Sequence, residues 1–212
     1  MGCKMSALKG QVKASSGDGE FVQELPEPDT YPAVVCAVVD LGTHTKKAFG
    51  SDAFEDVPLA LVAFQLGENK SDGTPHVVMQ EYRASCHVKS KLYDLACKVF
   101  RRKLGEGEPI DYFAMVGQPC SVTVAHGETA KGRKYARIDA VGSIGRGMIP
   151  PKPAQTAKYE IDQGDPKDTL DWLPYHFGKP VAEHISLSHE RQGTQGLKTR
   201  NDLPNGDAGE RF

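Results

Sequence analysis

The sequence contains no long apolar segment. Of its 212 residues, 39% are hydrophobic and 25% are charged, a composition typical of a globular protein. No run approaches the ~18 apolar residues of a membrane-spanning helix. The first 20 residues have no hydrophobic segment of the kind that a secretory signal contains. We therefore expect neither a membrane span nor a secretion signal.

Paired cysteines are also missing. The chain has five cysteines, an odd number, and no two of them have CxxC spacing. Three lie within apolar runs, where a free cysteine behaves as a small hydrophobic residue. This pattern argues against a disulfide framework and favours a reducing compartment. We predict a cytoplasmic protein.

The common catalytic signatures are absent too. The sequence has no GxSxG, HExxH, P-loop or DxD pattern. The glycine-rich stretch GSIGRG (142–147) follows a predicted strand and precedes two prolines rather than a helix, so we interpret it as a strand exit. We predict that the protein is not an enzyme and that it has no cofactor and no metal.

Two metal hypotheses stand against that prediction. Candidate zinc ligands lie near predicted strand ends, but they lack the two paired ligands of a structural zinc site. They are His76, Cys86, His87, Cys120 and His126. A second cluster, Asp165, Asp168 and Asp171, suits the magnesium of a nuclease. It equally suits the N-terminus of an exposed helix, whose dipole favours acidic side chains.

What the chain does contain is a specific order of elements. Hydrophobic periodicity predicts strands at 31–42, 57–66 and 76–84, a basic amphipathic helix at 90–104, and strands at 120–126 and 133–144. Five strands with a helix between the third and the fourth is the chain order of the OB-fold, a small Greek-key barrel. We therefore predict an all-β dominated fold: a five-stranded OB-fold barrel with a helix between strands 3 and 4, a short C-terminal helical segment and flexible tails.

Local signals set the expected ends of these elements. Gly42 is predicted to end the first strand in a bulge or turn, and residues 43–56 to form a long loop. Ser90 is a suitable N-cap for the helix, and Gly105 a suitable stop. Residues 110–120 predict a further helical turn.

The chain divides into four predicted segments. A disordered N-terminal arm at 1–24 precedes the OB-fold domain at 25–148. Residues 149–190 contain several prolines and the only tryptophan, and we expect this C-terminal extension to pack on the barrel. Residues 191–212 are predicted to be a flexible tail.

The charge is unevenly distributed. The net charge of −2 alone argues against a nucleic-acid ligand. However, residues 83–137 carry 11 basic and 5 acidic side chains, whereas residues 1–82 carry 6 basic and 12 acidic ones. A basic middle between acidic flanks can supply a local anion-binding face, although a basic helix can also be a solvated surface.

Aromatic and basic residues occur together where an OB-fold binds its ligand, on strands 2 and 3 and on the loops after strands 1 and 4. Proteins that bind single strands combine cations for phosphates with aromatic faces for bases. The candidate nucleic-acid-binding residues are Lys46, Lys47, Phe49, Phe54, Tyr82, Arg83, Lys131, Arg133, Lys134, Tyr135 and Arg137. Stacking is expected on Tyr82, Tyr135 and a first-loop phenylalanine. The alternative for each ring is packing inside the barrel.

Several segments resemble a known family. VVDLG (38–42), the helix after Lys89 and Ser90, and GQPCSVTVAH (117–126) resemble phage-encoded OB-fold single-stranded DNA-binding proteins. The resemblance covers roughly residues 25–190. It implies a role in phage DNA replication or recombination, in the cytoplasm of a bacterial host. The family's acidic tail recruits replication partners, but here basic residues offset the acids before the terminal Phe212.

We therefore predict a protein that binds single-stranded DNA with little sequence preference. Replication or recombination proteins are possible partners, and the protein can form a homo-oligomer. The alternative is an OB-fold adaptor or inhibitor that binds proteins, in which the basic helix faces a partner instead of DNA.

Overall fold

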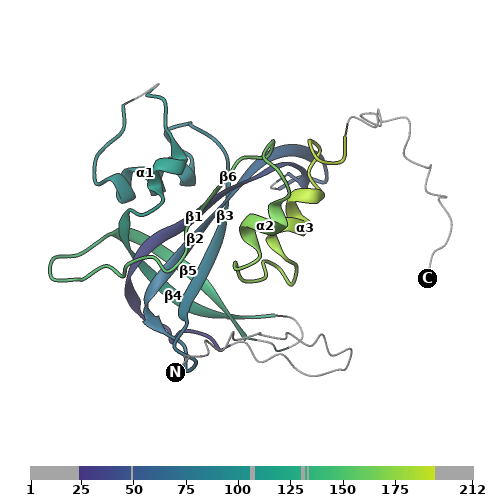
Figure 1. Ribbon diagram of the computed structural model, residues 1–212. Helices are drawn as coiled ribbons and strands as arrows, with labels where there is room; N and C mark the ends of the chain where they lie inside the picture. The colour runs from purple at the N-terminus through teal and green to yellow at the C-terminus, as the bar shows by residue number, and fades with distance from the viewer. Residues whose placement is uncertain (1–23, 49, 106–107, 130–131, 133, 194–212) are drawn as a thin grey trace, which may run out of the picture.

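The computed structural model describes residues 24–48, 50–105, 108–129, 132 and 134–193 (Figure 1). Its strands are β1 (Thr30–Lys47), β2 (Phe54–Asn69), β3 (Pro75–Arg83), β4 (Pro119–Glu128), β5 (Lys134–Ser143) and β6 (Ala157–Tyr159). Its helices are α1 (Lys91–Phe100), the 3₁₀ turn η1 (Tyr112–Met115), α2 (Pro166–Leu170) and α3 (Val181–Ser186). The fold is therefore mostly β with few helices, as predicted. The predicted N-terminal arm up to residue 23 and most of the predicted tail lie outside the described residues, whereas Glu24 accepts hydrogen bonds from Ser71.

The strands form one sheet in the order β3-β2-β1-β4-β5, antiparallel throughout, with β6 parallel to β1. β1 is the central strand. One edge of β1 pairs with β2. Along the other edge of β1, residues 30–34 pair with β4 and residues 37–39 pair with β6. Within the described residues no ladder joins β3 to β5, although Cα atoms of the two strands approach within 8 Å. The structure thus shows a sheet whose two end strands come close together.

Both faces of the β1–β2 pair are buried. The inner face packs against α1, β4 and β5 in one core, which includes Phe64 of β2 and Leu92 of α1. The outer face packs against β6, α2 and α3 of the C-terminal extension in a second core, which includes Leu61 of β2 and Ile185 of α3. In β2 the two sets alternate strictly, because successive side chains of a strand point to opposite faces. Apolar residues on both faces make the continuous hydrophobic run that marks this strand in the sequence.

A β-bulge in β1 keeps its side chains in phase with these two cores. The register shifts between Val35 and Ala37. Val35 lies in the inner core, Cys36 and Ala37 both lie in the outer core, and Val38 returns to the inner core. The extra residue therefore reverses the alternation once along the strand.

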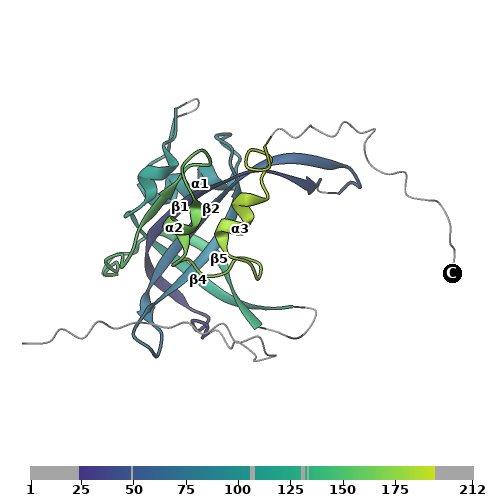
Figure 2. The ribbon, with the colours of Figure 1, turned by 45° about the vertical axis from the view of Figure 1, so that its right-hand side comes forward.

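The predicted end of the first strand is wrong. β1 continues through Gly42 to Lys47, and β2 begins at Phe54, so most of residues 43–56 form a paired hairpin instead of a loop. Gly42 has a φ of 78° at a second register shift, a conformation that glycine adopts at little cost. It bends the strand without ending it. Figure 2 shows this hairpin projecting beyond the rest of the sheet.

The C-terminal extension is fastened to β1 at this glycine. Both carboxylate oxygens of Glu190 accept hydrogen bonds from Thr43, from its backbone N–H at 2.8 Å and from its hydroxyl at 2.6 Å. The His189 N–H donates to the Thr43 carbonyl oxygen at 3.0 Å. A Cβ at position 42 would lie 2.7 Å from the Cβ of Ser188, so only glycine allows this close approach.

The helix between β3 and β4 is confirmed, but it ends earlier than predicted. The Ser90 hydroxyl oxygen accepts from the Tyr93 N–H at 3.1 Å, which confirms the N-cap. Arg101, with a φ of 55°, ends the helix, and Gly105 is not the stop. The Arg102 N–H then donates to the Cys97 carbonyl oxygen at 3.1 Å, as in a Schellman ending.

The predicted turn near residues 110–120 is confirmed as η1. The Asp111 carboxylate caps it by accepting from the Phe113 N–H at 2.9 Å. Among the described residues, none of the helices is long and apolar enough to cross a membrane.

Candidate nucleic-acid interface

The hairpin of β1 and β2 carries three of the predicted residues. The ammonium of Lys46 pairs with Glu81 of β3, and Lys47 Nζ lies 2.6 Å from Asp52 Oδ1. Phe54, which is opposite Lys47 in the ladder, is 71% exposed. The hairpin therefore offers one free aromatic ring and two cations whose charges are partly neutralised. Phe49, Lys131 and Arg133 of the predicted set lie outside the described residues.

Glu81 is the centre of a charged cluster below this hairpin. Besides Lys46, it faces the imidazole of His176 in the C-terminal extension, with 3.8 Å between Nε2 and Oε2. Burial alone would raise the pKa of Glu81. The neighbouring His176 and Lys46 outweigh burial and lower that pKa to about 2. The carboxylate therefore stays charged and links β1, β3 and the extension.

This link predicts a specific loss of stability in acid. Because the folded-state pKa of Glu81 is below its ordinary value of 4.5, its contribution is complete above pH 4.5 and is lost as the pH falls toward 2. The shift corresponds to at most about 3 kcal/mol. Chemical denaturation at several pH values should show a smaller acid loss for Glu81→Gln than for the wild type. Glu160→Gln, on an exposed residue, should keep the wild-type slope, and equal slopes for all three proteins would contradict the prediction.

Tyr82 and Arg83 at the end of β3 differ in their exposure to solvent. Tyr82 is only 6% exposed, packs in the inner core and donates its hydroxyl to Gln80 Oε1 at 2.9 Å. A ring covered in this way has no face for a base, so Tyr82 leaves the predicted stacking set. Arg83 is exposed and pairs with Glu55 at 2.5 Å. Exposed pairs of this kind contribute about 0–1 kcal/mol, so a phosphate can compete for Arg83.

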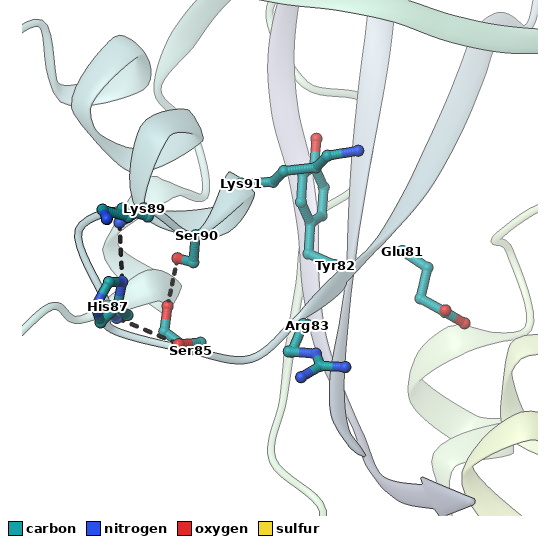
Figure 3. A pocket seen from close by; sticks show the side chains of 8 residues that line it. All are labelled: Glu81, Tyr82, Arg83, Ser85, His87, Lys89, Ser90 and Lys91. Carbon is teal, nitrogen blue, oxygen red and sulfur yellow. Dashed lines mark hydrogen bonds between the residues drawn. The ribbon is translucent and has the colours of Figure 1, made fainter. Parts of the chain in front are cut away.

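A basic hollow that the sequence analysis did not identify opens between β3 and α1 (Figure 3). Its volume is about 370 Å³. The loop that carries His87 and Lys89 lies on one side and Arg83 on the other, with Lys91 at the start of α1. The Lys89 N–H donates to His87 Nδ1 at 3.1 Å, which fixes the loop. The three cations Arg83, Lys89 and Lys91 outnumber Glu81, the one carboxylate of the lining, so the hollow suits an anionic group such as a phosphate.

The hairpin of β4 and β5 presents a tyrosine ring on a glycine. Tyr135 is 45% exposed and lies directly opposite Gly127 in the ladder. A Cβ on Gly127 would be 2.5 Å from Tyr135 Cζ, so the ring rests on the backbone of β4. One face of the ring is therefore supported and the side chain is partly open to solvent. Lys134 is exposed beside it, and Arg137, two residues away on the same face, lies 3.3 Å from Asp139.

The outer face of β2 and β3 is covered by the C-terminal extension. Leu59 and Leu61 of β2 are buried under α2, α3 and β6, and Met79 of β3 packs against the same core. The extension lies between the β1–β2 hairpin and the β4–β5 hairpin in both ribbon views (Figures 1 and 2). A ligand therefore cannot use the strand face on which the sequence-based prediction relied in part. The hairpins, the basic hollow and the surface of the extension are accessible.

No group of three or more His, Cys, Asp or Glu side chains suited to a metal ion occurs in the described part of the chain. Asp165, one of the candidate magnesium ligands, instead caps α2 by accepting from the Lys167 N–H at 3.0 Å. His126, one of the candidate zinc ligands, lies with Nε2 2.8 Å from the carbonyl oxygen of Pro26.

Comparisons with known proteins add no further constraint. No protein-family model matches the chain, and no curated protein matches it. The functional argument therefore depends on the geometry described above.

Proposed function

We propose that the protein binds single-stranded DNA with little sequence preference, on an OB-type barrel, and acts without catalysing a reaction. Its biological setting would be the phage type of DNA replication or recombination that the sequence resemblance implies. Phosphates would pair with the cations of the basic hollow and the last hairpin, while bases would stack on exposed aromatic rings.

The strand order supports the OB-type barrel. In that fold β1 pairs with both β2 and β4, a helix connects β3 to β4, and the barrel is partly open. The order β3-β2-β1-β4-β5 with α1 after β3 agrees with this arrangement. The approach of β3 to β5 within 8 Å is what a barrel that closes between these strands requires.

The observation that carries the binding proposal is the seat of Tyr135 on Gly127. An aromatic ring that rests on backbone and keeps an accessible face is a ready platform for a base, and it loses little side-chain entropy on binding because it is already positioned. Lys134 lies in the same hairpin, directly before Tyr135, and is exposed. This hairpin corresponds to a ligand-binding loop of the OB-fold.

Substitutions at this platform test the proposal. Tyr135→Ala should weaken the binding of a labelled oligothymidylate, measured by fluorescence anisotropy at low salt, by about 5- to 150-fold, the value of one stacked base. Gly127→Ala removes no ring and no charge, but its new Cβ forces the tyrosine off its seat. It should therefore reduce the affinity in the same direction. Gly164→Ala, where a Cβ meets no atom within 4 Å, is the matched control.

The outcomes separate binding from the adaptor hypothesis. An adaptor whose surface serves proteins would leave the oligonucleotide affinity unchanged in Tyr135→Ala and Gly127→Ala. Absence of binding by the wild type at low salt, or equal affinity for duplex and single strand, would overturn the proposed function.

A further inference from the structure

Two exposed aromatic rings lie in the C-terminal extension, outside the predicted binding set. Among the described residues the exposed aromatic side chains are Phe54, Tyr135, Tyr175 and Phe177. Tyr175 is 69% exposed and Phe177 80% exposed, so both rings are largely in solvent. They flank His176, whose side chain is buried, on the short segment between α2 and α3.

The segment is a tight turn that holds Phe177 in an unusual conformation. His176 and Lys179 exchange two backbone hydrogen bonds, of 2.8 and 3.1 Å. Phe177 and Gly178 between them have φ values of 48° and 79°, the pattern of a type I′ turn. A positive φ is uncommon for a residue other than glycine, asparagine or aspartate. The Phe177 ring is 80% exposed although its backbone has a positive φ, and strained positions of this kind concentrate at functional sites.

The turn is held firmly in place by its histidine. The carbonyl oxygen of His176 accepts a hydrogen bond from His184 Nε2–H of α3 at 2.7 Å. The imidazole ring of His176 packs against the ring of Phe177, with 4.2 Å between the ring centroids. Its Nε2 faces Glu81 of β3, which in turn binds Lys46 of the hairpin. The two exposed rings therefore lie on a turn that is hydrogen-bonded to α3, and its histidine faces the Glu81–Lys46 pair of β3 and β1 without a hydrogen bond to it.

The same glutamate connects the turn to the basic hollow. Glu81 lines the hollow between β3 and α1 together with Arg83, Lys89 and Lys91. Figure 3 shows its carboxylate pointing toward the ribbon of the C-terminal extension, away from the loop of Lys89. Cations suited to phosphates line the same hollow as Glu81, and Glu81 in turn faces His176, the residue between the two exposed aromatic rings. This is the combination with which proteins hold a single strand.

We infer that the turn Tyr175–Lys179 is a base-stacking site of the single-stranded DNA ligand. Tyr175 and Phe177 each take one base, and the neighbouring phosphates lie against the basic hollow. The extension covers the aliphatic outer face of β2 and β3 and supplies exposed aromatic rings, which that face lacks. The inference rests on the proposed function and extends it to a part of the chain that the OB-fold does not contain.

The experiment compares variants that keep the turn but lose its rings. Phe177→Asn retains a residue that tolerates a positive φ, and Tyr175→Ala removes the other ring. Each should weaken the binding of an oligothymidylate of about 16 nucleotides, the upper site size of one OB-fold, by about fivefold or more. Phe177→Tyr keeps an aromatic face and should retain the wild-type affinity. Leu187→Ala, an exposed apolar residue of the same extension, is the matched control.

A second measurement identifies the contact directly. Photocrosslinking with a 5-iodouridine oligonucleotide should yield an adduct on the peptide that contains Tyr175 and Phe177. Wild-type affinity of both ring-removing variants, with no adduct on this peptide, overturns the inference. If Tyr135→Ala still weakens binding in that case, the proposed function stands alone. If the wild-type protein binds no oligonucleotide, the proposed function fails and this inference fails with it.

Discussion

A chain that ends at residue 148 is expected not to fold into a stable monomer. This truncation removes β6, α2 and α3 and leaves the N-terminal segment that the sequence predicts to be a complete OB-fold domain. It exposes the outer face of β1 and β2, where Val39, Leu41, Val57, Leu59 and Leu61 are at most 4% exposed in the full structure. Full exposure of five such side chains costs about 10 kcal/mol. That is comparable to the whole stability of a typical domain, about 5–15 kcal/mol.

Size-exclusion chromatography and binding of a hydrophobic dye measure this outcome. The truncated chain should elute as aggregates or as an expanded species that binds the dye. A chain that ends at residue 193 keeps every element of the extension and is the control, which should be compact and monomeric. A cooperatively folded monomer of residues 1–148 would show that the extension is dispensable and would contradict the prediction.

Oligonucleotide binding is expected to weaken steeply with salt. Four cations near the proposed ligand path have accessible side chains: Arg83, Lys89, Lys91 and Lys134. If about four phosphates are neutralised, the logarithm of affinity falls with the logarithm of salt at a slope near −3 for a single strand. Raising the salt from about 50 to 200 mM then reduces the affinity roughly 50-fold.

A charge variant makes this prediction specific to the hollow. Replacing both Lys89 and Lys91 with alanine should reduce the magnitude of the slope by about 1.4, because each phosphate contact contributes about 0.7. Lys158→Ala, on the exposed side of β6, removes one positive charge away from the hollow and should leave the slope unchanged. Affinities are measured by anisotropy titration at four or more salt concentrations. A slope that is equal in all three proteins would exclude the hollow as a phosphate site.

The sequence predicts a strand well where the side chains on both of its faces are buried and apolar. The run 57–66 is apolar on both faces, and it lies within β2. The predicted end of β1 at Gly42 is wrong because this glycine, a common terminator, here lies at a bulge between two paired stretches. The sequence does not predict β6 because a strand of three residues carries no periodic signal. Its position is defined by the edge of β1 that β4 leaves open, and this is a tertiary property.

The sequence predicts only part of the candidate site, and each wrong or missing residue has a physical reason. Tyr82 is wrongly predicted as a stacking residue because the sequence of a strand does not tell which of its two faces is inside, and the structure buries Tyr82 in the inner core with Val78. The seat of Tyr135 on Gly127 requires the hairpin register, which the sequence leaves open because the turn is long. The exposed ring of Phe177 precedes Gly178, and this glycine is the one local signal of the turn that displays it.

The fastening of Glu190 to Thr43 also has a consequence for how the protein is made. The two residues are 147 positions apart in the chain. At a synthesis rate of about 5–20 residues per second, roughly 7–30 s pass between the translation of the hairpin and that of the glutamate that holds it. During that interval the outer face of β1 and β2 has no cover of its own. The nascent chain therefore offers an apolar surface to chaperones until the extension, through Glu190, has left the ribosome.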